Sequence, residues 1–276
     1  IEIIEDSGEI TIAPDITNFP LSTEKEISNI VEKDGKLYLS TPFAIVVYDI
    51  ENLVFGDTFF IGNGSTEVRV NEIKIRNDQI FAATENGIYV ADLSNPNLID
   101  FNNWTHYFSG NFTSIEIFND RIFTARTNSL YEIKSPNNLQ FITSLSSEIL
   151  KIKSSPTCLS IATQRQAIFY NESLISKGNI VSNINSEYYF DLNTSYADEQ
   201  YVYLATKEFG LLQTSLSNSS EFVEIHPEGP TSNDIFSITV SNDNLWVVYG
   251  GYDSAYTPLN NRFGFSHYNG ENWINT

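Results

Sequence analysis

The chain has 276 residues, of which 35 are acidic and 15 are basic, so its net charge is −20 at neutral pH. This balance argues against nucleic acid and against an anionic membrane surface as partners, because both require clusters of Lys and Arg. No stretch reaches the ~18 apolar residues of a membrane span, which excludes direct insertion as a helix. The single cysteine, Cys158, lies in an apolar run and is expected to be a buried core residue.

Two short apolar segments begin the chain. Ile1–Ile4 and Glu9–Ile12, joined by turn residues at 6–8, are expected to be strands. They are typical of the last two strands of a sheet whose first two strands are missing, so we expect further sheets upstream. Because the last apolar segment runs to Thr276, we also expect a further domain downstream.

A two-strand pattern then recurs along the chain. In its clearest copy, the apolar run Ile80–Ala83 predicts a strand buried on both faces, Asn86-Gly87 predicts a two-residue turn with positive φ, and Ile88–Val90 predicts the return strand. Copies of the first strand follow one another at intervals of 43, 42, 37, 43 and 43 residues, with equivalent positions at Leu37, Ile80, Ile122, Leu159, Val202 and Leu245. This period indicates four-stranded propeller blades, which take roughly 40–45 residues each.

Each copy has a further strand on either side. The strands expected before the central pair are Ile27–Val31, Val70–Ile75, Phe112–Phe118, Ile149–Ile152, Tyr188–Phe190 and Ile235–Val240. Turn pairs such as Asp34-Gly35, Asn77-Asp78 and Asn119-Asp120 separate most of them from the central strand. The outer strands expected after the pair are Thr58–Ile61, Thr105–Phe108, Gln140–Leu145, a weak strand near Leu174-Ile175, Phe222–His226 and Trp273-Ile274.

These elements predict an all-β fold with almost no helix, since no window of helical length shows the i, i+3, i+4 apolar spacing. The fold class is a β-propeller of four-stranded antiparallel blades, with six full blade repeats and a partial N-terminal blade, hence six to seven blades. We expect residues 1–276 to form a single propeller domain excised from a longer chain.

Two segments interrupt the repeat. Asn95–Trp104 joins a return strand to its outer strand, and Gly250–Arg262 is inserted between the central and return strands of the last copy. Insertions on a rigid scaffold often carry binding groups. We therefore predict a ligand-binding role for Tyr252, Tyr256 and Arg262, because tyrosine rings offer flat faces to sugars and arginine can pair with an anionic group. The alternative is a loop that packs on a neighbouring blade or domain.

The sequence shows no catalytic motif. The three histidines His106, His226 and His267 are scattered over separate repeats, without the spacing of a metal site. There is no G-x-S-x-G, no P-loop and no strand–GxGxxG–helix unit. We therefore predict no enzyme activity, no catalytic residues, no metal and no cofactor. The tryptophans at 104, 246 and 273 are expected to be packing residues, with Trp246 buried in its central strand.

Four segments of the sequence resemble a known protein family. They are Phe55–Gly62, Ile80–Asp92, Asn95–Trp104 and Arg262–Trp273, and they resemble the N-terminal propeller of the PorZ family, surface components of the type IX secretion system of Bacteroidetes. The blades also look like the regulator-propeller repeats in the sensor halves of hybrid histidine kinases. The resemblance covers most of the chain.

The resemblance implies two propellers in tandem followed by a C-terminal sorting domain, of which this chain would be most of the first propeller. It also implies an extracytoplasmic location at the outer membrane surface, a sortase-type surface protein as partner, and binding of anionic lipopolysaccharide without catalysis. Two other functions remain open. One is an extracytoplasmic glycan-sensing propeller of a two-component regulator, and the other is a propeller enzyme that acts on polysaccharide.

Overall fold

The computed structural model describes residues 2–4, 7–12, 15–18, 20, 24–232, 234–242, 244–260 and 264–276. The chain forms two compact units, Ile1–Glu224 and Ile225–Thr276, and we describe each by itself. The single domain over residues 1–276 therefore stays a prediction.

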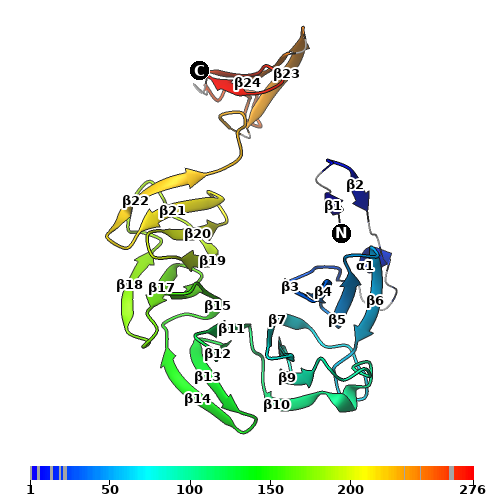
Figure 1. Cartoon of the computed structure of the whole chain (residues 1–276). Helices are drawn as coiled ribbons and strands as arrows, with labels where there is room; N and C mark the ends of the chain where they lie inside the picture. The colour runs from blue at the N-terminus through cyan, green and yellow to red at the C-terminus, as the bar shows by residue number, and fades with distance from the viewer. Residues whose placement is uncertain are drawn as a thin grey trace. The chain divides into compact units, whose positions relative to one another are not determined.

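The described residues form six four-stranded antiparallel sheets and one two-stranded sheet (Figure 1). The two-stranded sheet pairs β1 (Glu2–Ile4) with β2 (Ile10–Ile12). Blade 1 comprises β3 (Asn29–Lys33), β4 (Lys36–Ser40), β5 (Ile45–Asp49) and β6 (Val54–Phe59). Blade 2 comprises β7 (Val70–Arg76), β8 (Gln79–Thr84), β9 (Gly87–Asp92) and β10 (Thr105–Ser109). Blade 3 comprises β11 (Ser114–Phe118), β12 (Arg121–Arg126), β13 (Ser129–Ser135) and β14 (Asn138–Ser144).

Blade 4 comprises β15 (Ile149–Ser154), β16 (Leu159–Thr163), β17 (Gln166–Tyr170) and β18 (Ser176–Val181). Blade 5 comprises β19 (Leu192–Ala197), β20 (Val202–Thr206), β21 (Leu211–Ser215) and β22 (Asn218–Ile225). Blade 6 comprises β23 (Ile235–Ser241), β24 (Asn244–Tyr249), β25 (Phe265–Tyr268) and β26 (Trp273–Asn275). The only helices in the described ranges are α1 (Asp15–Asn18) and the 3₁₀ turn η1 (Phe101–Asn103).

The propeller fold class is therefore confirmed, with six complete blades and one partial blade at the N-terminus. The first strands of consecutive blades are neighbours: β3 contacts β7, β7 contacts β11, β11 contacts β15, and β15 contacts β19. In most of these first strands a β-bulge follows the first paired residue, for example between Val70 and Glu72 and between Ile149 and Lys151. A bulge shifts the strand by one residue, so blades that share it have the same register between their first and second strands after the bulge.

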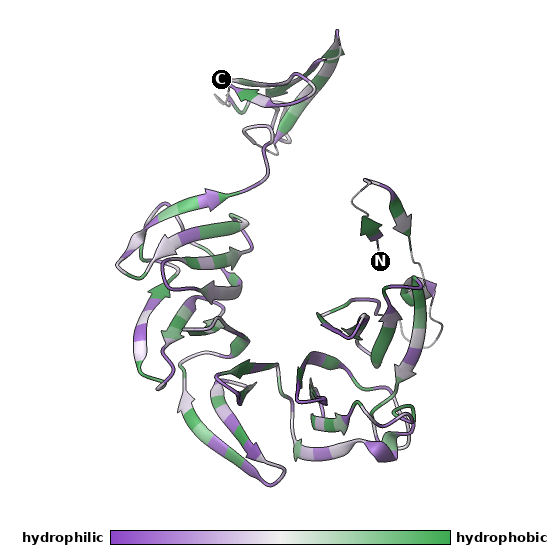
Figure 2. Cartoon of the chain, in the orientation of Figure 1, coloured by the Kyte–Doolittle hydropathy of each residue, from purple (hydrophilic) through white to green (hydrophobic). Residues whose placement is uncertain are grey.

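In the first unit, separate hydrophobic clusters lie at the interfaces between blades 1 and 2, 2 and 3, 3 and 4, and 4 and 5. Ile80 and Ala82 of β8 pack toward blade 1, whereas Phe81 and Ala83 pack toward blade 3. Successive side chains of a strand point to opposite faces, so a run of apolar residues without alternation is what a strand between two blades requires. Figure 2 shows stretches of hydrophobic residues along the strands of each blade. Cys158 is free and fully buried in the cluster between blades 4 and 5, as predicted.

The sequence predicts a two-residue turn with positive φ at Asn86-Gly87, but turns of this kind lie at other positions. Two turns between first and second strands, at Asn77-Asp78 and at Asn119-Asp120, have positive φ at both residues. Asn86 does not have positive φ, and the hydroxyl of Thr84 closes that turn instead. It accepts hydrogen bonds from the N–H groups of Asn86 and Gly87 and donates one to the carbonyl of Gly87.

The same device recurs in other blades. The hydroxyls of Thr41, Thr163 and Thr206 donate to the carbonyls of Ala44, Gln166 and Gly210 at the equivalent turns. A threonine at the end of the second strand therefore replaces the type I′ turn that Asn-Gly usually forms.

Two of the expected strands are wrong. The first strand of blade 5 is β19, not Tyr188–Phe190, because Tyr188 lies in a turn that bridges to Asn185. The outer strand of blade 4 is β18, not Leu174-Ile175. Leu174 has a φ of 58°, and Oδ1 of Asn171 accepts hydrogen bonds from the N–H groups of Ser173 and Ile175, which makes this segment a turn.

The tryptophans mostly behave as packing residues. Trp104 is buried, and its ring centroid lies 6.0 Å from that of Phe59 across the interface between blades 1 and 2. Trp246 is only partly buried, contrary to expectation, and its ring stacks on that of His267 at a centroid distance of 4.0 Å. Trp273 is also partly buried and lies against Tyr268.

Candidate functional site

The inserted loop of blade 6 is an ordered turn that exposes two of the three predicted binding residues. Oδ1 of Asp253 accepts hydrogen bonds of 2.8 Å from the N–H groups of Ala255 and Thr257, and Tyr252 pairs with Pro258. Tyr252 is 56% exposed and Tyr256 is 85% exposed. Arg262 lies outside the described residues, so the binding role of these three side chains stays a prediction.

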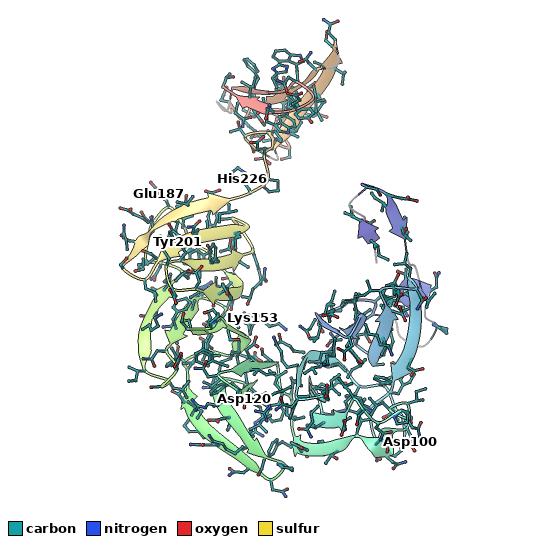
Figure 3. The ribbon with its side chains drawn as sticks, viewed as in Figure 1. Asp100, Asp120, Lys153, Glu187, Tyr201 and His226 are labelled. Carbon is teal, nitrogen blue, oxygen red and sulfur yellow. The ribbon has the colours of Figure 1, made fainter. Side chains whose placement is uncertain are left out.

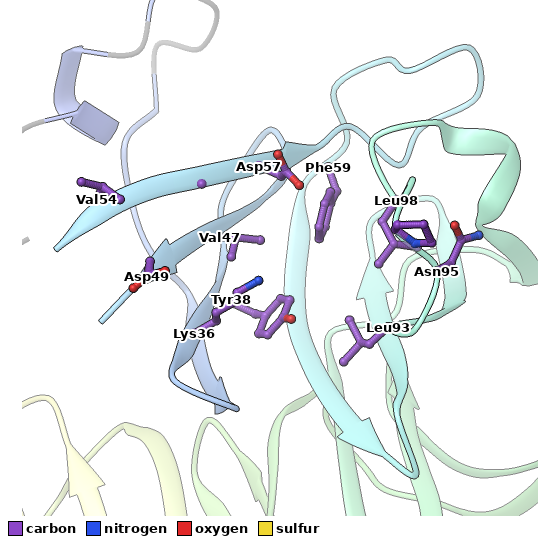
Figure 4. Close-up of a pocket in the computed structure, with 12 residues that line it drawn as sticks. Lys36, Tyr38, Val47, Asp49, Val54, Asp57, Phe59, Leu93, Asn95 and Leu98 are labelled. Carbon is purple, nitrogen blue, oxygen red and sulfur yellow. The ribbon is translucent and has the colours of Figure 1, made fainter. Parts of the chain in front are cut away.

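A second candidate is a groove between blades 1 and 2. One hollow of about 300 Å³ lies between β4–β6 and the segment that follows β9 (Figure 4). Figure 4 shows Tyr38 and Phe59 of blade 1 on one side of it, with Leu93 and Leu98 of blade 2 on the other. An adjoining hollow of about 420 Å³ shares the lining residues Lys36, Tyr38 and Leu93. We call the two hollows together the blade 1–2 groove.

The groove combines an apolar floor with an acidic rim. Its charged lining residues are Asp34, Asp49, Asp57 and Asp78 on one hand and Lys33 and Lys36 on the other. Lys33 crosses the interface, with its Nζ 3.2 Å from Asp34 and 3.3 Å from Asp78. The rim therefore carries a net negative charge, which favours a partner with basic side chains.

Two polar groups in the groove are available to a partner. Within the described part of the chain, neither the Tyr38 hydroxyl nor the Asp57 carboxylate has a hydrogen-bond partner. Burial, helped by the nearby charge of Asp34, raises the pKa of Tyr38, so its hydroxyl stays protonated and can donate. By contrast, Asp49 already accepts hydrogen bonds from the backbone N–H and the side-chain amide of Asn52, which lower its pKa.

A third cluster is formed by charged side chains on the first strands of blades 2, 3 and 4. Glu72 of β7 is fully buried, and its carboxylate lies 2.6 Å from Nζ of Lys153 and 3.6 Å from Nζ of Lys151, both on β15. On the neighbouring strands, Lys74 pairs with Glu116 at 2.9 Å. Lys153, labelled in Figure 3, marks where this cluster lies among the first strands. We call it the first-strand charge cluster.

Hydrogen bonds complete the first-strand charge cluster. The Ser114 hydroxyl donates to the Glu72 carboxylate and accepts from the N–H of Ile152, so one side chain of β11 joins β7 to β15. Burial acts to raise the pKa of Glu72, but the two lysines and Ser114 outweigh it and hold that pKa below its ordinary value. Burial likewise lowers the pKa of Lys151. The cluster is therefore saturated by its own partners and is best explained as structural.

The residues that the structure describes offer little for other kinds of chemistry. Among them, no group of three or more His, Cys, Asp or Glu side chains is arranged to hold a metal ion. Nor does any helix in those ranges have the length and apolar character to cross a bilayer.

Sequence reasoning missed the blade 1–2 groove because its lining is spread over residues 33–98 and two blades. The available signal was four aspartates: Asp34 and Asp78 in turns, Asp49 at the end of β5 and Asp57 within β6. Asp34 and Asp78 fit ordinary turn chemistry equally well, and only the packing of the two blades brings the four aspartates to one rim.

Comparison with known proteins gives one family match. Residues 1–105 match the family model described as "TSS9, PorZ, N-terminal beta-propeller domain". No curated protein matches the sequence.

Solved structures share the fold. A structure of PorZ, described as an essential surface component of the type-IX secretion system of Porphyromonas gingivalis, is 17% identical with a TM-score of 0.65, covering 100% of this chain and 36% of that one. The extracellular domain of a protein described as a one-component system of B. thetaiotaomicron is 18% identical with a TM-score of 0.54, covering 83% of this chain and 32% of that one. A computationally designed protein, Ika8, is 7% identical with a TM-score of 0.52, covering 81% of this chain and 68% of that one.

At these identities the structural likeness shows the shared fold, and the chain spans about a third of the length of the PorZ structure. The family match is independent of that likeness and covers the segment that contains blade 1 and most of blade 2. The resemblance seen in the sequence is thus confirmed over residues 1–105, which match the PorZ N-terminal propeller model, and the whole chain shares the fold of the PorZ structure.

Proposed function

We propose that this chain is a non-enzymatic binding and scaffold propeller of the cell surface that supports the attachment complex of a type IX secretion system. The observation that carries the proposal is the PorZ match over residues 1–105. That segment supplies all the lining residues of the blade 1–2 groove, which is the surface of the described residues best suited to a protein partner. The partner we propose is a sortase-type surface protein, and the second ligand is anionic lipopolysaccharide.

The groove suits an extended segment of a partner protein. Its length over two adjoining hollows, its apolar floor and its acidic rim together match a segment that alternates apolar and basic side chains. The available Tyr38 hydroxyl and Asp57 carboxylate would accept or donate the hydrogen bonds that fix its position.

Charge reversal on the two sides of the groove tests this role. The probe is the purified sortase of the same bacterium, titrated against the full chain by biolayer interferometry. Asp57→Lys should weaken binding about tenfold, because it replaces an attraction with a repulsion, whereas Lys36→Glu should leave it unchanged or strengthen it. Glu187→Lys, an exposed change of the same charge on the turn before blade 5, is the matched control (Figure 3). Equal weakening by Asp57→Lys and Glu187→Lys would reduce the result to net charge and reject the groove.

The lipopolysaccharide role is tested on the blade 6 loop. Changing Tyr252, Tyr256 and Arg262 together to Ala should weaken binding of purified anionic lipopolysaccharide while the melting temperature stays nearly the same, since both described tyrosines are exposed. Unchanged affinity in the titration would discard these residues as the site.

A sensory role is the second candidate, because the chain also shares its fold with the extracellular domain of a two-component or one-component system. In this case the propeller would bind a periplasmic glycan. The full reading frame distinguishes the two functions: a sorting domain downstream supports the first, and a transmembrane helix followed by a kinase supports the second.

A further inference from the structure

A third hollow, on blade 2, has a lining of a different kind from the groove. Its volume is about 460 Å³, within the range of about 300–1,000 Å³ that small-molecule sites take. The lining consists of aromatic and amide side chains with one aliphatic residue: Tyr89, Phe101, Trp104, His106, Asn63, Asn102 and Ile61. None of these is a carboxylate, a lysine or an arginine, although the chain carries 35 acidic side chains. We call this hollow the aromatic pocket.

The aromatic side of the pocket is held in place by the surrounding structure. The rings of Tyr89 and His106 lie next to each other, with centroids 4.7 Å apart and planes inclined by 33°. Gly87, which faces them across the strand pair, is required there because a Cβ would collide with the His106 ring. Trp104 donates from Nε1 to the carbonyl of Leu98 at 2.9 Å, which fixes the indole. The ring surfaces are therefore formed before any ligand arrives.

The loop that carries the amide side is fixed as well. Asp100, labelled in Figure 3, caps η1: its Oδ1 accepts hydrogen bonds from the backbone N–H of Asn102 at 3.0 Å and from its side-chain amide at 2.8 Å. Asn103 donates to the carbonyl of Asn97 at 2.7 Å. One N–H of the Asn102 side-chain amide is engaged by Asp100, so its second N–H and its carbonyl oxygen are left to donate and accept hydrogen bonds with a ligand.

Several polar groups of the pocket have no partner in the protein. Within the described ranges, the Tyr89 hydroxyl, the ring nitrogens of His106 and the side-chain amide of Asn63 make no hydrogen bond. Burial raises the pKa of Tyr89, so its hydroxyl remains a donor at neutral pH. The pocket thus presents donors and acceptors of both kinds around aromatic faces, without a carboxylate, lysine or arginine in its lining.

We propose that the aromatic pocket binds one ring of a neutral saccharide. The C–H face of a pyranose packs against aromatic rings, and its hydroxyls, which both donate and accept, match amide, phenol and imidazole groups. An anionic sugar or a phosphate would find no lysine or arginine in the lining, and a charged peptide side chain would lose its solvation without compensation. The inference uses different residues from the lipopolysaccharide and sortase proposals and does not depend on either.

The test is saturation-transfer difference NMR of the full chain with the methyl glycosides of glucose, galactose, mannose and N-acetylglucosamine. At least one glycoside should receive saturation at its ring protons. Tyr89→Phe should weaken its binding about threefold to tenfold, the effect of one lost hydrogen bond, and Tyr89→Ala together with His106→Ala should abolish it.

Tyr131→Ala is the matched control, since Tyr131 holds the same place in the third strand of blade 3, opposite Thr124 as Tyr89 is opposite Ala82. It should leave the signal intact. Because Tyr89→Phe removes only a hydroxyl, it keeps the fold and separates binding from stability. Absence of saturation transfer to all four glycosides at millimolar concentration would overturn the proposal. A signal that persists in the Tyr89→Ala/His106→Ala double variant would overturn it as well.

Discussion

The first-strand charge cluster and the aromatic pocket place similar polar groups in opposite situations. In the cluster, the carboxylate of Glu72 is fully buried, yet two lysines, a serine hydroxyl and a backbone N–H surround it. In the pocket, the Tyr89 hydroxyl has no partner among the described residues. Groups that are satisfied within the protein contribute to its stability, whereas groups left unsatisfied in a preformed hollow are available to a ligand. The difference separates structural from binding residues on one scaffold.

The largest effect on stability is expected at Glu72. Replacing it by Gln keeps the shape but leaves Lys151 and Lys153 without their counter-charge, so the free energy of unfolding should fall by about 3 kcal/mol. Urea unfolding followed by circular dichroism measures the change. The same titration on Lys36→Glu, an exposed rim residue, should show a change near zero; a loss of similar size there would contradict the comparison.

The same carboxylate predicts a dependence on pH. Its pKa in the folded chain lies below the ordinary value of 4.5, so its contribution is complete above that pH and disappears as the pH falls through the folded pKa. The difference in unfolding free energy between the wild type and Glu72→Gln should therefore be constant from pH 7 to about pH 5 and shrink below it. Denaturation series at fixed pH values give this curve. A difference that grows toward low pH would have the wrong sign.

A smaller effect is expected at Ser114. Its replacement by Ala removes the hydroxyl that joins Glu72 to the N–H of Ile152 and leaves both partners incompletely bonded, which should cost about 1–3 kcal/mol. Ser129→Ala, at a partly buried serine of blade 3 whose hydroxyl bonds only the neighbouring Asn128, is the control. Equal losses of unfolding free energy in the two variants would show that the hydrogen bonds of Ser114 to Glu72 and Ile152 contribute no more to stability than an ordinary serine hydroxyl does.

The smallest effect on stability is expected in the groove. Tyr38→Phe removes a hydroxyl without a partner, so the free energy of unfolding should change by less than about 0.5 kcal/mol. Binding of the sortase-type protein should still weaken, by about threefold, through the lost donor. Thermal unfolding and biolayer interferometry on one sample measure the two quantities. Loss of stability without loss of binding would assign Tyr38 to the core.

The sequence predicted the fold better than the sites, for a physical reason. Each blade is built from local signals: apolar runs such as Ile80–Ala83 and turn pairs such as Asn77-Asp78 have their meaning within one repeat. It failed where those signals were weak, as for β19, whose polar residues hide a first strand, and at Asn86-Gly87, where the Thr84 hydroxyl determines the turn.

The sites depend on contacts between repeats. The blade 1–2 groove joins Tyr38 to Leu98, and the aromatic pocket joins Asn63 to His106, which are neighbours only after two blades have packed. Neither pairing leaves a motif in the sequence. The blade 6 loop was predicted because it interrupts the repeat, and exposure of Tyr252 and Tyr256 is compatible with its proposed role.

Hydrogen–deuterium exchange of the full chain, with and without purified anionic lipopolysaccharide and the neutral methyl glycosides, tests most directly whether ligands bind at the aromatic pocket and the blade 6 loop and not at the first-strand charge cluster. The account predicts protection by the glycosides at residues 61–63 and 87–106, protection by lipopolysaccharide at 249–260, and no change in β7, β11 or β15. Protection confined to those three first strands would contradict it.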